Sequence, residues 1–386
     1  MTERDPRPAL IIFGHFSPQT YFMQFNRDVA RAIAADGWDV LWVSPPGGIR
    51  AAPLAWLLSF RRGRLTREGQ LWHFRPWAIP GRRFPPFGAR ALKAARRQLE
   101  RAIHEVKMDA PAIMFYLPDD WPLIEEISHG RTGYWVGDIA LNQLDTYAGL
   151  RDFLVAVDVV LPISPQACDD ARALGLREIV PLATGVTLAR FEQPTTPADL
   201  KDIPRPIAGY VGGMGADRFD VALVMAAARE LPDVSFVLVG PSDAAVDRSL
   251  RRDAPHNIHY LGMRSYEEVS DYMCAFDVGL VPYLVNDFNT GSNPLKVYEY
   301  FAAGIPVVTT ALRSVEERGE LVYVARTPAE FSGAIRSALA ERDPQRAESR
   351  KAIAEQHSTE RIASLVEAAL SSKVGPLPLP SDGGPE

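Results

Sequence analysis

Short apolar segments alternate with amphipathic helical segments along most of this chain, and this alternation limits the possible folds more than any other feature. Residues 9–13 (ALIIF) and 39–46 (DVLWVSPP) are predicted strands, and residues 21–37 between them form a predicted helix that ends at a glycine. Because strands joined by helices pair in parallel, the rhythm predicts a doubly wound parallel sheet. Four more strands continue it, at 112–117, 133–137, 159–164 and 179–184.

A Pro- and Thr-rich passage at 191–206 interrupts this rhythm, and we interpret it as a linker between domains. The pattern starts again at 207–213 (IAGYVGG), and further strands are predicted at 235–240, 257–262, 278–283 and 321–326. The sequence thus predicts two Rossmann-like α/β domains that face each other across a central cleft, at 1–190 and 207–357. Residues 373–386, rich in Pro and Gly, are expected to be disordered.

Length and composition agree with this organisation. A chain of 386 residues is long enough for two domains with a core each, and a net charge of −6 argues against binding of nucleic acid by the chain as a whole. Cys168 and Cys274 lie in apolar helical contexts, which favours inert buried thiols over a disulfide or a metal site. The N-terminal MTERDPRP is unlike a signal peptide, and no run of 18 apolar residues is present, so we expect a cytoplasmic protein without a membrane span.

Residues 289–310 (NTGSNPLKVYEYFAAGIPVVTT) predict a polar loop, a short helix and a buried strand, an arrangement that binds anions at the helix N-terminus. Pro294 suits the first helical turn, Lys296 adds a cation, and Glu299 could accept hydrogen bonds from a ribose diol. In the alternative interpretation, Lys296 and Glu299 only form a helical i, i+3 pair. The amides expected to point at a phosphate belong to Ser292, Asn293, Leu295 and Lys296.

This segment resembles the donor-site signature of the GT-B glycosyltransferases, specifically the family-4 group of nucleotide-sugar enzymes, also described as glycosyl transferases group 1. The resemblance covers most of the chain, strongly at 207–310 and more loosely at 130–190. It implies that Glu299 holds the nucleotide ribose. It also implies that a final helix at 358–372 crosses back to the first domain, as in similar folds.

The first strand of the second half ends in Gly212 and Gly213, where a diphosphate could approach the backbone, and Arg218 follows in a turn (GADRFD). The run resembles the family segment in which a basic residue after a glycine turn neutralises the donor diphosphate. A glycine turn with a solvated arginine is the alternative.

Two further loops follow strands in the second half and resemble the family's nucleobase pocket, although loops without a binding role are an equal alternative. One position in the polar loop before the predicted short helix departs from the family pattern. Gly291 stands where many members carry the first of two glutamates, which leaves the donor sugar and the stereochemical outcome open. Pro294, Lys296 and Glu299 match the P-x-K-x-x-E arrangement that some subgroups keep. The predicted pocket residues are Gly240, Gly262, Met263, Arg264 and Tyr266.

On the first domain, Asp138 follows the strand GYWVG and His15 follows the first strand, so both are expected near the acceptor. Asp138 could position a sugar hydroxyl, or simply cap a helix. His15 could bind the acceptor or the diphosphate, or be an ordinary loop residue.

The segment from Gly48 to Lys107 holds fourteen Lys or Arg against three Glu, interleaved with tryptophan, leucine and phenylalanine. This pattern within residues 50–101 favours contact with an anionic membrane surface, so that the protein would be peripheral on the inner face of the cytoplasmic membrane. A basic groove for a polyanionic glycan or nucleic acid is an alternative. A solvated helix at 89–107 over core aromatics is another.

The sequence therefore predicts a glycosyltransferase that moves a sugar from a nucleoside-diphosphate donor to a glycan or lipid-linked acceptor in surface polysaccharide assembly. Arg218, Lys296 and the helix N-terminus near Asn293 would stabilise the leaving diphosphate. The resemblance implies retention of the anomeric configuration and no metal or other cofactor. A nucleotide-sugar 2-epimerase shares the fold but would need several acid/base residues, and residues 1–190 show no clear cluster of them. A non-catalytic nucleotide-sugar-binding protein remains a third possibility.

Overall fold

The chain consists of two compact units, seen in a computed structural model. The structure describes residues 7–14, 24–45, 63–76, 87–137, 141 and 149–371. The N-terminal unit comprises residues 1–163, 167–182 and 362–386, and the C-terminal unit comprises residues 164–166 and 183–361.

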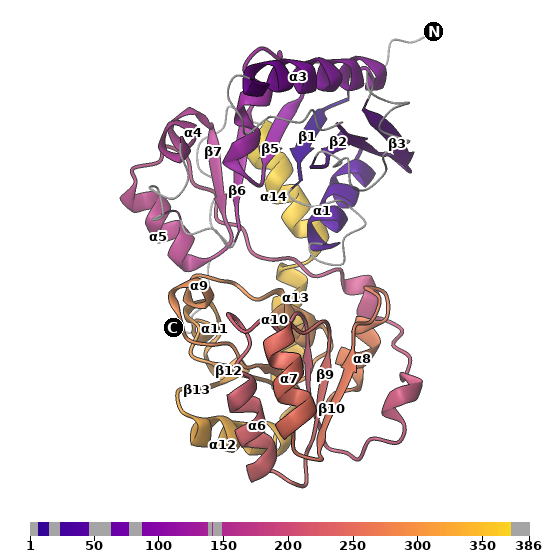
Figure 1. The fold of residues 1–386 in the computed structure, drawn as a ribbon, viewed down its shortest axis with the longest axis vertical. Helices are drawn as coiled ribbons and strands as arrows, with labels where there is room; N and C mark the ends of the chain where they lie inside the picture. Colours follow the sequence, from indigo (N-terminus) through magenta and orange to yellow (C-terminus); the bar gives the residue numbers. More distant parts are fainter. Residues whose placement is uncertain are drawn as a thin grey trace. The chain divides into compact units, whose positions relative to one another are not determined.

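The N-terminal unit is built on one seven-stranded sheet with the order β3-β4-β2-β1-β5-β6-β7 (Figure 1). All neighbouring strands are parallel except the β3–β4 hairpin. The hairpin was not predicted, because most residues of β3 are exposed and charged and so lack an apolar pattern. The predicted strand at 179–184 is wrong: it is reduced to a single bridge between Ile179 and Val160. The strands are β1 (Ala9–Phe13), β2 (Asp39–Val43), β3 (Arg64–Glu68), β4 (Leu71–Arg75), β5 (Ala112–Phe115), β6 (Thr132–Val136) and β7 (Val159–Pro162).

Most strands of this sheet carry apolar residues on both faces, and helices pack against these faces. Ile11, Phe13 and Leu41 belong to one buried cluster together with Leu99 and Ile103 of α3. The C-terminal helix α14 also belongs to this unit in its residues from 362 onward, and it is drawn among the unit's elements in Figure 1. The helices are α1 (Gln24–Ala35), α3 (Phe87–Val106), α4 (Leu150–Ala156), α5 (Pro165–Ala173) and α14 (Thr359–Ser371).

Glu367 on α14 gives the N-terminal unit a pH-dependent stability. Burial, together with the charge of Asp36, raises the pKa of Glu367 to about 7. The unfolded chain has the ordinary value near 4.5, so folding takes up a proton between these pH values and stability falls as the pH rises through this window. We expect Glu367→Gln to raise the melting temperature at pH 8 and to leave it nearly unchanged at pH 5. The exposed Glu105→Gln is the control, and equal shifts at both pH values would contradict the prediction.

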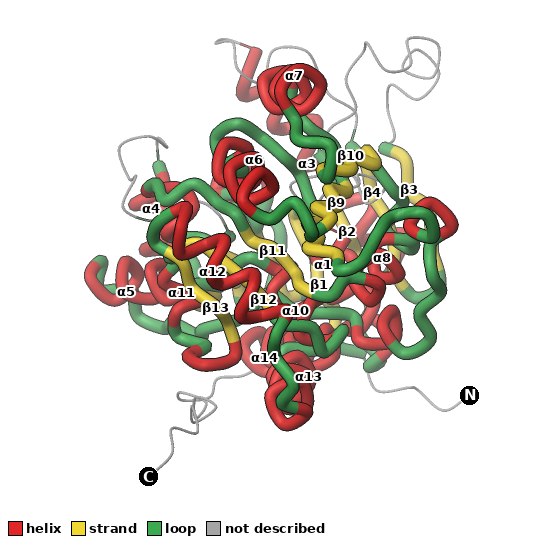
Figure 2. The backbone as a smooth tube through the Cα atoms, turned by 90° about the horizontal axis from the view of Figure 1, so that it is seen from below, coloured by secondary structure: helices red, strands yellow, loops and turns green. Residues whose placement is uncertain are grey.

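The C-terminal unit contains a second parallel sheet with the order β10-β9-β8-β11-β12-β13. Every strand predicted in this half is present, and Figure 2 shows the alternation of helices and strands by colour. The strands are β8 (Ile207–Val211), β9 (Ser235–Val239), β10 (Ile258–Gly262), β11 (Val278–Val281), β12 (Val307–Thr310) and β13 (Val322–Ala325). The helices are α6 (Val221–Glu230), α7 (Ala244–Asp253), α8 (Val269–Ala275), α9 (Asp287–Thr290), α10 (Leu295–Ala302), α11 (Arg313–Glu316), α12 (Pro328–Leu339) and α13 (Pro344–Gln356). The predicted pair of Rossmann-like doubly wound domains is confirmed.

The Pro- and Thr-rich passage at 191–206 belongs to the C-terminal unit instead of forming a separate linker. Asp199 forms an ion pair with Arg264 (Oδ2 to Nη2, 2.6 Å), and the backbone N–H of Thr195 donates to the carboxylate of Asp271 (2.9 Å). The observed boundary falls at residue 183, before the predicted one at 190. Proline-rich composition signals a lack of regular secondary structure, but it does not exclude tertiary contacts.

Strand order reverses once in each sheet, between β1 and β5 and between β8 and β11. Ligands of open parallel sheets bind outside the carboxyl ends of the strands at such a switch point. The two switch points are therefore where functional side chains are expected.

Candidate active site

Three glycines lie at the carboxyl ends of neighbouring strands in the C-terminal unit. Gly212, Gly240 and Gly262 all have positive φ, of 145°, 135° and 71°. A Cβ atom on Gly240 would lie only 2.0 Å from the carbonyl oxygen of Gly212, so the two backbones touch and no side chain fits between them. Gly213 continues this edge and its carbonyl accepts a hydrogen bond from the Tyr210 hydroxyl (2.7 Å). These strand ends carry no side chains at the three glycines, and the backbones of Gly212 and Gly240 pack directly against each other.

Gly240→Ala is expected to lower the free energy of unfolding of the C-terminal unit by at least about 2 kcal/mol, because it combines a backbone clash with an unfavourable φ. Gly333→Ala is the matched control. Gly333 lies inside α12 with nothing within 4 Å of a new Cβ, so alanine there should stabilise by roughly 0.5–1 kcal/mol. Denaturation followed by circular dichroism measures both, and a Gly240→Ala variant as stable as wild type would refute the close contact.

Arg218 is held in place by contacts that the sequence did not reveal. Its carbonyl accepts the N–H of Leu284 (2.9 Å), and Phe219 bridges to Tyr283. The amide of Asn289, a fully buried residue, donates to the carbonyls of Asp217 (3.3 Å) and Arg218 (3.4 Å). The turn with Arg218 is therefore fixed to the segment after β11.

Lys296 and Arg218 converge on the phenol of Tyr283. The buried ammonium of Lys296 donates a hydrogen bond to the Tyr283 hydroxyl and lies 4.6 Å from the centre of its ring. The Arg218 guanidinium lies 5.5 Å from the same ring centre and 4.7 Å from that of Phe288. A Cβ on Gly212 would lie 3.2 Å from Lys296 Nζ, so this cation stands directly beside the glycine edge. The structure thus brings together three residues predicted for diphosphate binding.

The two cations lower the pKa of the Tyr283 phenol. Burial is the largest influence and by itself raises the pKa of this phenol, but Lys296 and then Arg218 outweigh it and hold the pKa below its ordinary value. Two cations thus act on one buried phenol at this edge of the sheet.

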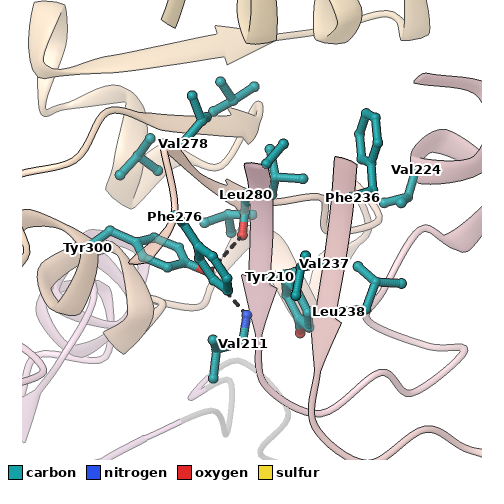
Figure 3. Packing of buried hydrophobic residues seen from close by; sticks show 14 of the residues in the cluster. Tyr210, Val211, Val224, Phe236, Val237, Leu238, Phe276, Val278, Leu280 and Tyr300 are labelled. Carbon is teal, nitrogen blue, oxygen red and sulfur yellow. Dashed lines mark hydrogen bonds between the residues drawn. The ribbon is translucent and has the colours of Figure 1, made fainter. Parts of the chain in front are cut away.

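Helix α10, which carries Lys296 and Glu299, is anchored at the switch point by Tyr300 (Figure 3). The Tyr300 hydroxyl accepts the N–H of Val211 on β8 (3.1 Å) and donates toward the carbonyl of Leu280 on β11 (3.4 Å). It therefore satisfies backbone groups of both strands at the place where their pairing has ended, since the β8–β11 ladder stops at Gly209 and Gly279. Burial raises the pKa of Tyr300, so its hydroxyl stays neutral.

The loop before α10 differs in one respect from the prediction. The amide of Ser292 is not available to a ligand, because it donates to the carbonyl of Asn289 (3.0 Å). The carbonyl of Ser292 accepts the Ser314 hydroxyl (2.7 Å), and the side-chain oxygen of Asn293 accepts the Tyr298 hydroxyl (3.1 Å). Pro294 is the N-cap residue, one position before the first helical turn that was predicted for it, and Leu295 and Lys296 carry the first N–H groups of α10.

Gly291 occupies ordinary helical backbone geometry, with φ of −80°. The nearest atom to a Cβ there would be the Asp287 carbonyl oxygen at 3.8 Å, so the structure does not require glycine at this position.

Glu299 is buried and bound to Arg190, which was not predicted to be functional. Arg190 Nη1 lies 3.2 Å from Glu299 Oε1, and Nη2 donates to the carbonyl of Tyr266 (2.6 Å). The guanidinium also lies 3.8 Å from the centre of the Tyr266 ring. Lys296 and Glu299 thus have separate partners, and the alternative of a simple i, i+3 pair is wrong.

The side chain of Arg264 is bound to other residues of the C-terminal unit, and its loop stays a predicted part of the nucleobase pocket, in which backbone groups would read the base edge. Arg264 donates to Asp199 (2.6 Å), to the Tyr272 hydroxyl (2.8 Å) and to the carbonyl of Leu261 (2.6 Å). Met263 is 61% exposed.

His15 and Asp138, the predicted residues of the acceptor side, lie outside the described residues. Around the switch point of the N-terminal unit, the indole of Trp42 lies directly against Gly14, since a Cβ there would be 2.4 Å from Nε1. The Trp42 ring is 6.1 Å from Tyr116, and Tyr116 is 5.6 Å from Trp135. Trp42 Nε1 and the Tyr116 hydroxyl are both buried and, within the described ranges, have no hydrogen-bond partner.

The basic segment is only partly described, since 46–62 and 77–86 lie outside the described residues. On α3, Arg90, Lys93, Arg97 and Arg101 are exposed at spacings that place them along one face. Arg96 differs from these four because it is buried and bound to Glu126 and to the carbonyl of Pro122 (2.7 Å).

Two kinds of feature are absent from the described part of the chain. None of its helices combines the length and apolar character needed to cross a bilayer. It also holds no group of three or more His, Cys, Asp or Glu residues placed to bind a metal ion.

Part of the chain matches a known protein family. Residues 205–341 match the family model described as Glycosyl transferases group 1. TuaH from Bacillus subtilis (strain 168) is 34% identical over 115 residues. Its name describes a glycosyltransferase of teichuronic acid biosynthesis. That stretch covers 29% of this chain and 28% of the relative, so the chain matches less than a third of that protein's length.

Two solved structures resemble nearly the whole chain. Sucrose-phosphate synthase from Thermosynechococcus elongatus has a TM-score of 0.65 at 19% identity, over 95% of this chain and 96% of that one. Anabaena HepE, solved in complex with UDP and glucose, has a TM-score of 0.67 at 15% identity, over 95% of this chain and 100% of that one. These likenesses establish the fold. Residues 205–341 thus match the glycosyl transferases group 1 family, and the chain has the two-domain GT-B fold.

Proposed function

We propose that this protein is a glycosyltransferase that takes a sugar from a nucleoside-diphosphate donor. One observation carries the proposal: Lys296 and Arg218 converge beside Gly212 at the switch point of the C-terminal sheet. Two cations next to bare backbone suit a diphosphate, which needs positive charge and close access. The family of the domain and the UDP bound in HepE support the same ligand class.

The proposed chemistry follows from where charge develops. As the bond between the anomeric carbon and the diphosphate breaks, negative charge gathers on the leaving phosphate. Lys296, Arg218 and the first N–H groups of α10 stabilise that charge. Glu299 binds the ribose, and the backbone of Gly240 and Gly262 lies on the nucleobase side. We further propose that the anomeric configuration is retained, with the departing phosphate oxygen accepting the acceptor's proton, and that no metal is required.

The acceptor side is proposed to lie on the N-terminal unit, with Asp138 ahead of His15 as the residue that positions the acceptor hydroxyl. Trp42 and Tyr116 support this placement, because a polar ligand at the switch point could use their buried N–H and O–H groups. A glycan or lipid-linked saccharide of surface polysaccharide assembly is the proposed acceptor, in line with the name of the Bacillus relative.

The test is a thermal-shift panel of UDP-, GDP-, ADP- and dTDP-sugars, followed by measurement of nucleoside diphosphate release with glycan and lipid-linked acceptors. The correct donor should raise the melting temperature, because it binds only the native state. Formation of an epimerised nucleotide sugar would indicate an epimerase, and binding without any turnover would indicate a non-catalytic binder. An absence of binding to every nucleotide would overturn the proposal.

The exposed cations of α3 are proposed to attract the protein to the anionic inner face of the cytoplasmic membrane, at about 1 kcal/mol per cation near the surface. Replacing Arg97 and Arg101 by glutamate should reduce flotation with vesicles of anionic phospholipid. The control replaces Arg248 and Arg252, exposed on α7, in the same way. Equal flotation of the two variants would remove the membrane proposal and leave the transferase proposal unaffected.

A further inference from the structure

We propose that Arg190 holds Glu299 ready to receive a ribose diol, and that this contact restricts the donor to ribonucleotides over 2′-deoxyribonucleotides. The inference rests on the proposed function, in which Glu299 binds the sugar of the nucleotide. It concerns a residue that lies 109 positions away in the sequence, so no local motif connects the two.

The contact is specific in its geometry. The guanidinium of Arg190 uses Nη1 for Glu299 Oε1 (3.2 Å) and Nη2 for the carbonyl of Tyr266 (2.6 Å). Its central carbon Cζ lies over the Tyr266 ring, 3.8 Å from the ring centre. A planar fork that is held at two edges and stacked on one face has little freedom, so Arg190 fixes the position of Glu299.

Burial explains why this contact matters for a ligand. The Glu299 side chain is 9% exposed and that of Arg190 13%, so the carboxylate sits away from bulk water and depends on the cation beside it. The oxygens of a carboxylate accept hydrogen bonds from hydroxyl groups. A carboxylate has capacity for about four of them, so the single contact to Arg190 leaves room for two hydroxyls of a vicinal diol.

Arg190 also connects the ribose end of the site with the loop that follows β10. Tyr266 belongs to this predicted nucleobase loop, and Arg190 touches both its carbonyl and its ring. The Nε of Arg190 is buried and, within the described residues, has no hydrogen-bond partner, which leaves one donor of the guanidinium unused. Arg190 is therefore a positioning residue that sets both the carboxylate and the loop.

Arg264 provides the matched control. It too is an arginine that pairs with a carboxylate, Asp199, and lies near an aromatic ring, Tyr272. Its contacts involve neither Glu299 nor Tyr266. Loss of Arg264 should therefore affect stability without affecting recognition of the ribose.

The experiment measures, by calorimetry, the dissociation constants of UDP and 2′-deoxy-UDP, and of GDP and 2′-deoxy-GDP, for the intact chain. Wild type should bind the better ribonucleotide about 10- to 100-fold more tightly than its deoxy analogue, the range expected for a hydrogen bond to a charged group. Arg190→Met should bring this ratio close to 1, whereas Arg264→Met should keep the wild-type ratio.

A purely structural role for Arg190 would change both dissociation constants together and leave their ratio unchanged. If Arg190→Met fails to fold, Arg190→Lys replaces it, since lysine keeps the charge but not the fork, and a ratio reduced below wild type is again expected. A wild type that binds nucleoside diphosphates with a ratio near 1, or an unchanged ratio in the Arg190 variant, overturns the inference while the proposed function stands. A wild type that binds none of these nucleotides overturns the proposed function.

Discussion

Lys296→Ala should lower the rate constant of sugar transfer by about 10²–10³-fold, the usual cost of removing one group that stabilises transition-state charge. The reason is the position of the ammonium, which is buried beside Gly212, binds the Tyr283 hydroxyl and lies 4.9 Å from the centre of the Tyr210 ring. A cation held in this way needs no rearrangement when charge develops on the leaving diphosphate. Arg218→Ala should give a loss of similar size, because both cations face the same phenol.

The measurement is nucleoside diphosphate release from the nucleotide sugar that gives the largest thermal shift. Lys351→Ala serves as control, because Lys351 is about half exposed on α13 and pairs only loosely with Glu348 (3.5 Å). Melting temperatures of all variants show whether the site is intact. A Lys296→Ala enzyme that retains more than a tenth of wild-type activity would show that this cation does not act on the leaving group.

The second large effect concerns stability. Arg350→Met is expected to lower the free energy of unfolding of the C-terminal unit by about 3–5 kcal/mol. Arg350 is fully buried and binds both carboxylate oxygens of Glu341 (2.6 and 2.7 Å), and its Nε donates to the carbonyl of Leu321 (3.0 Å). Removing one partner leaves a buried carboxylate without its main counter-charge. Burial is the largest influence on Glu341 and raises its pKa, but Arg350 and Tyr323 outweigh burial and lower the pKa overall.

The unfolding experiment can resolve the two units. All seven tryptophans precede residue 164, so tryptophan emission reports on the N-terminal unit alone, whereas circular dichroism reports on both. Arg350→Met should destabilise the dichroism transition and leave the fluorescence transition in place. The double variant Arg350→Met/Glu341→Leu should recover most of the loss, because it removes both buried charges. A double variant as unstable as the single one would show that the loss comes from packing and not from charge.

The sequence predicted most of the fold because both sheets are mainly parallel and most of their strands are buried on both faces, so these strands are apolar runs between helices. It also predicted that Lys296, Arg218 and Gly212 lie at one edge of the C-terminal sheet, because the carboxyl ends of parallel strands share one side of a sheet. The β3–β4 hairpin escaped prediction for the opposite reason. Its outer strand is at the edge of the sheet and carries charges, as edge strands often do.

Residues that act through distant contacts could not be predicted. Arg190 reaches Glu299 across 109 positions, and Asn289 reaches the Arg218 turn across about seventy. The signal for Arg190 was present in the sequence as an arginine after a glycine-valine turn, but only its contacts distinguish it from a solvated side chain. Arg264 is the opposite case. It lies in a loop that the sequence predicts to be part of the nucleobase pocket, but its side chain forms an ion pair with Asp199.

The burial of Lys296 has a consequence for how the protein responds to ionic strength. Dissolved ions screen exposed charges within about 10 Å at 0.1 M salt, but they reach buried charges much less. The attraction of a diphosphate to Lys296 should therefore persist in concentrated salt, whereas that of an anionic surface to the exposed cations of α3 should fade. A change in salt concentration could thus release the protein from a charged surface while its nucleotide stays bound.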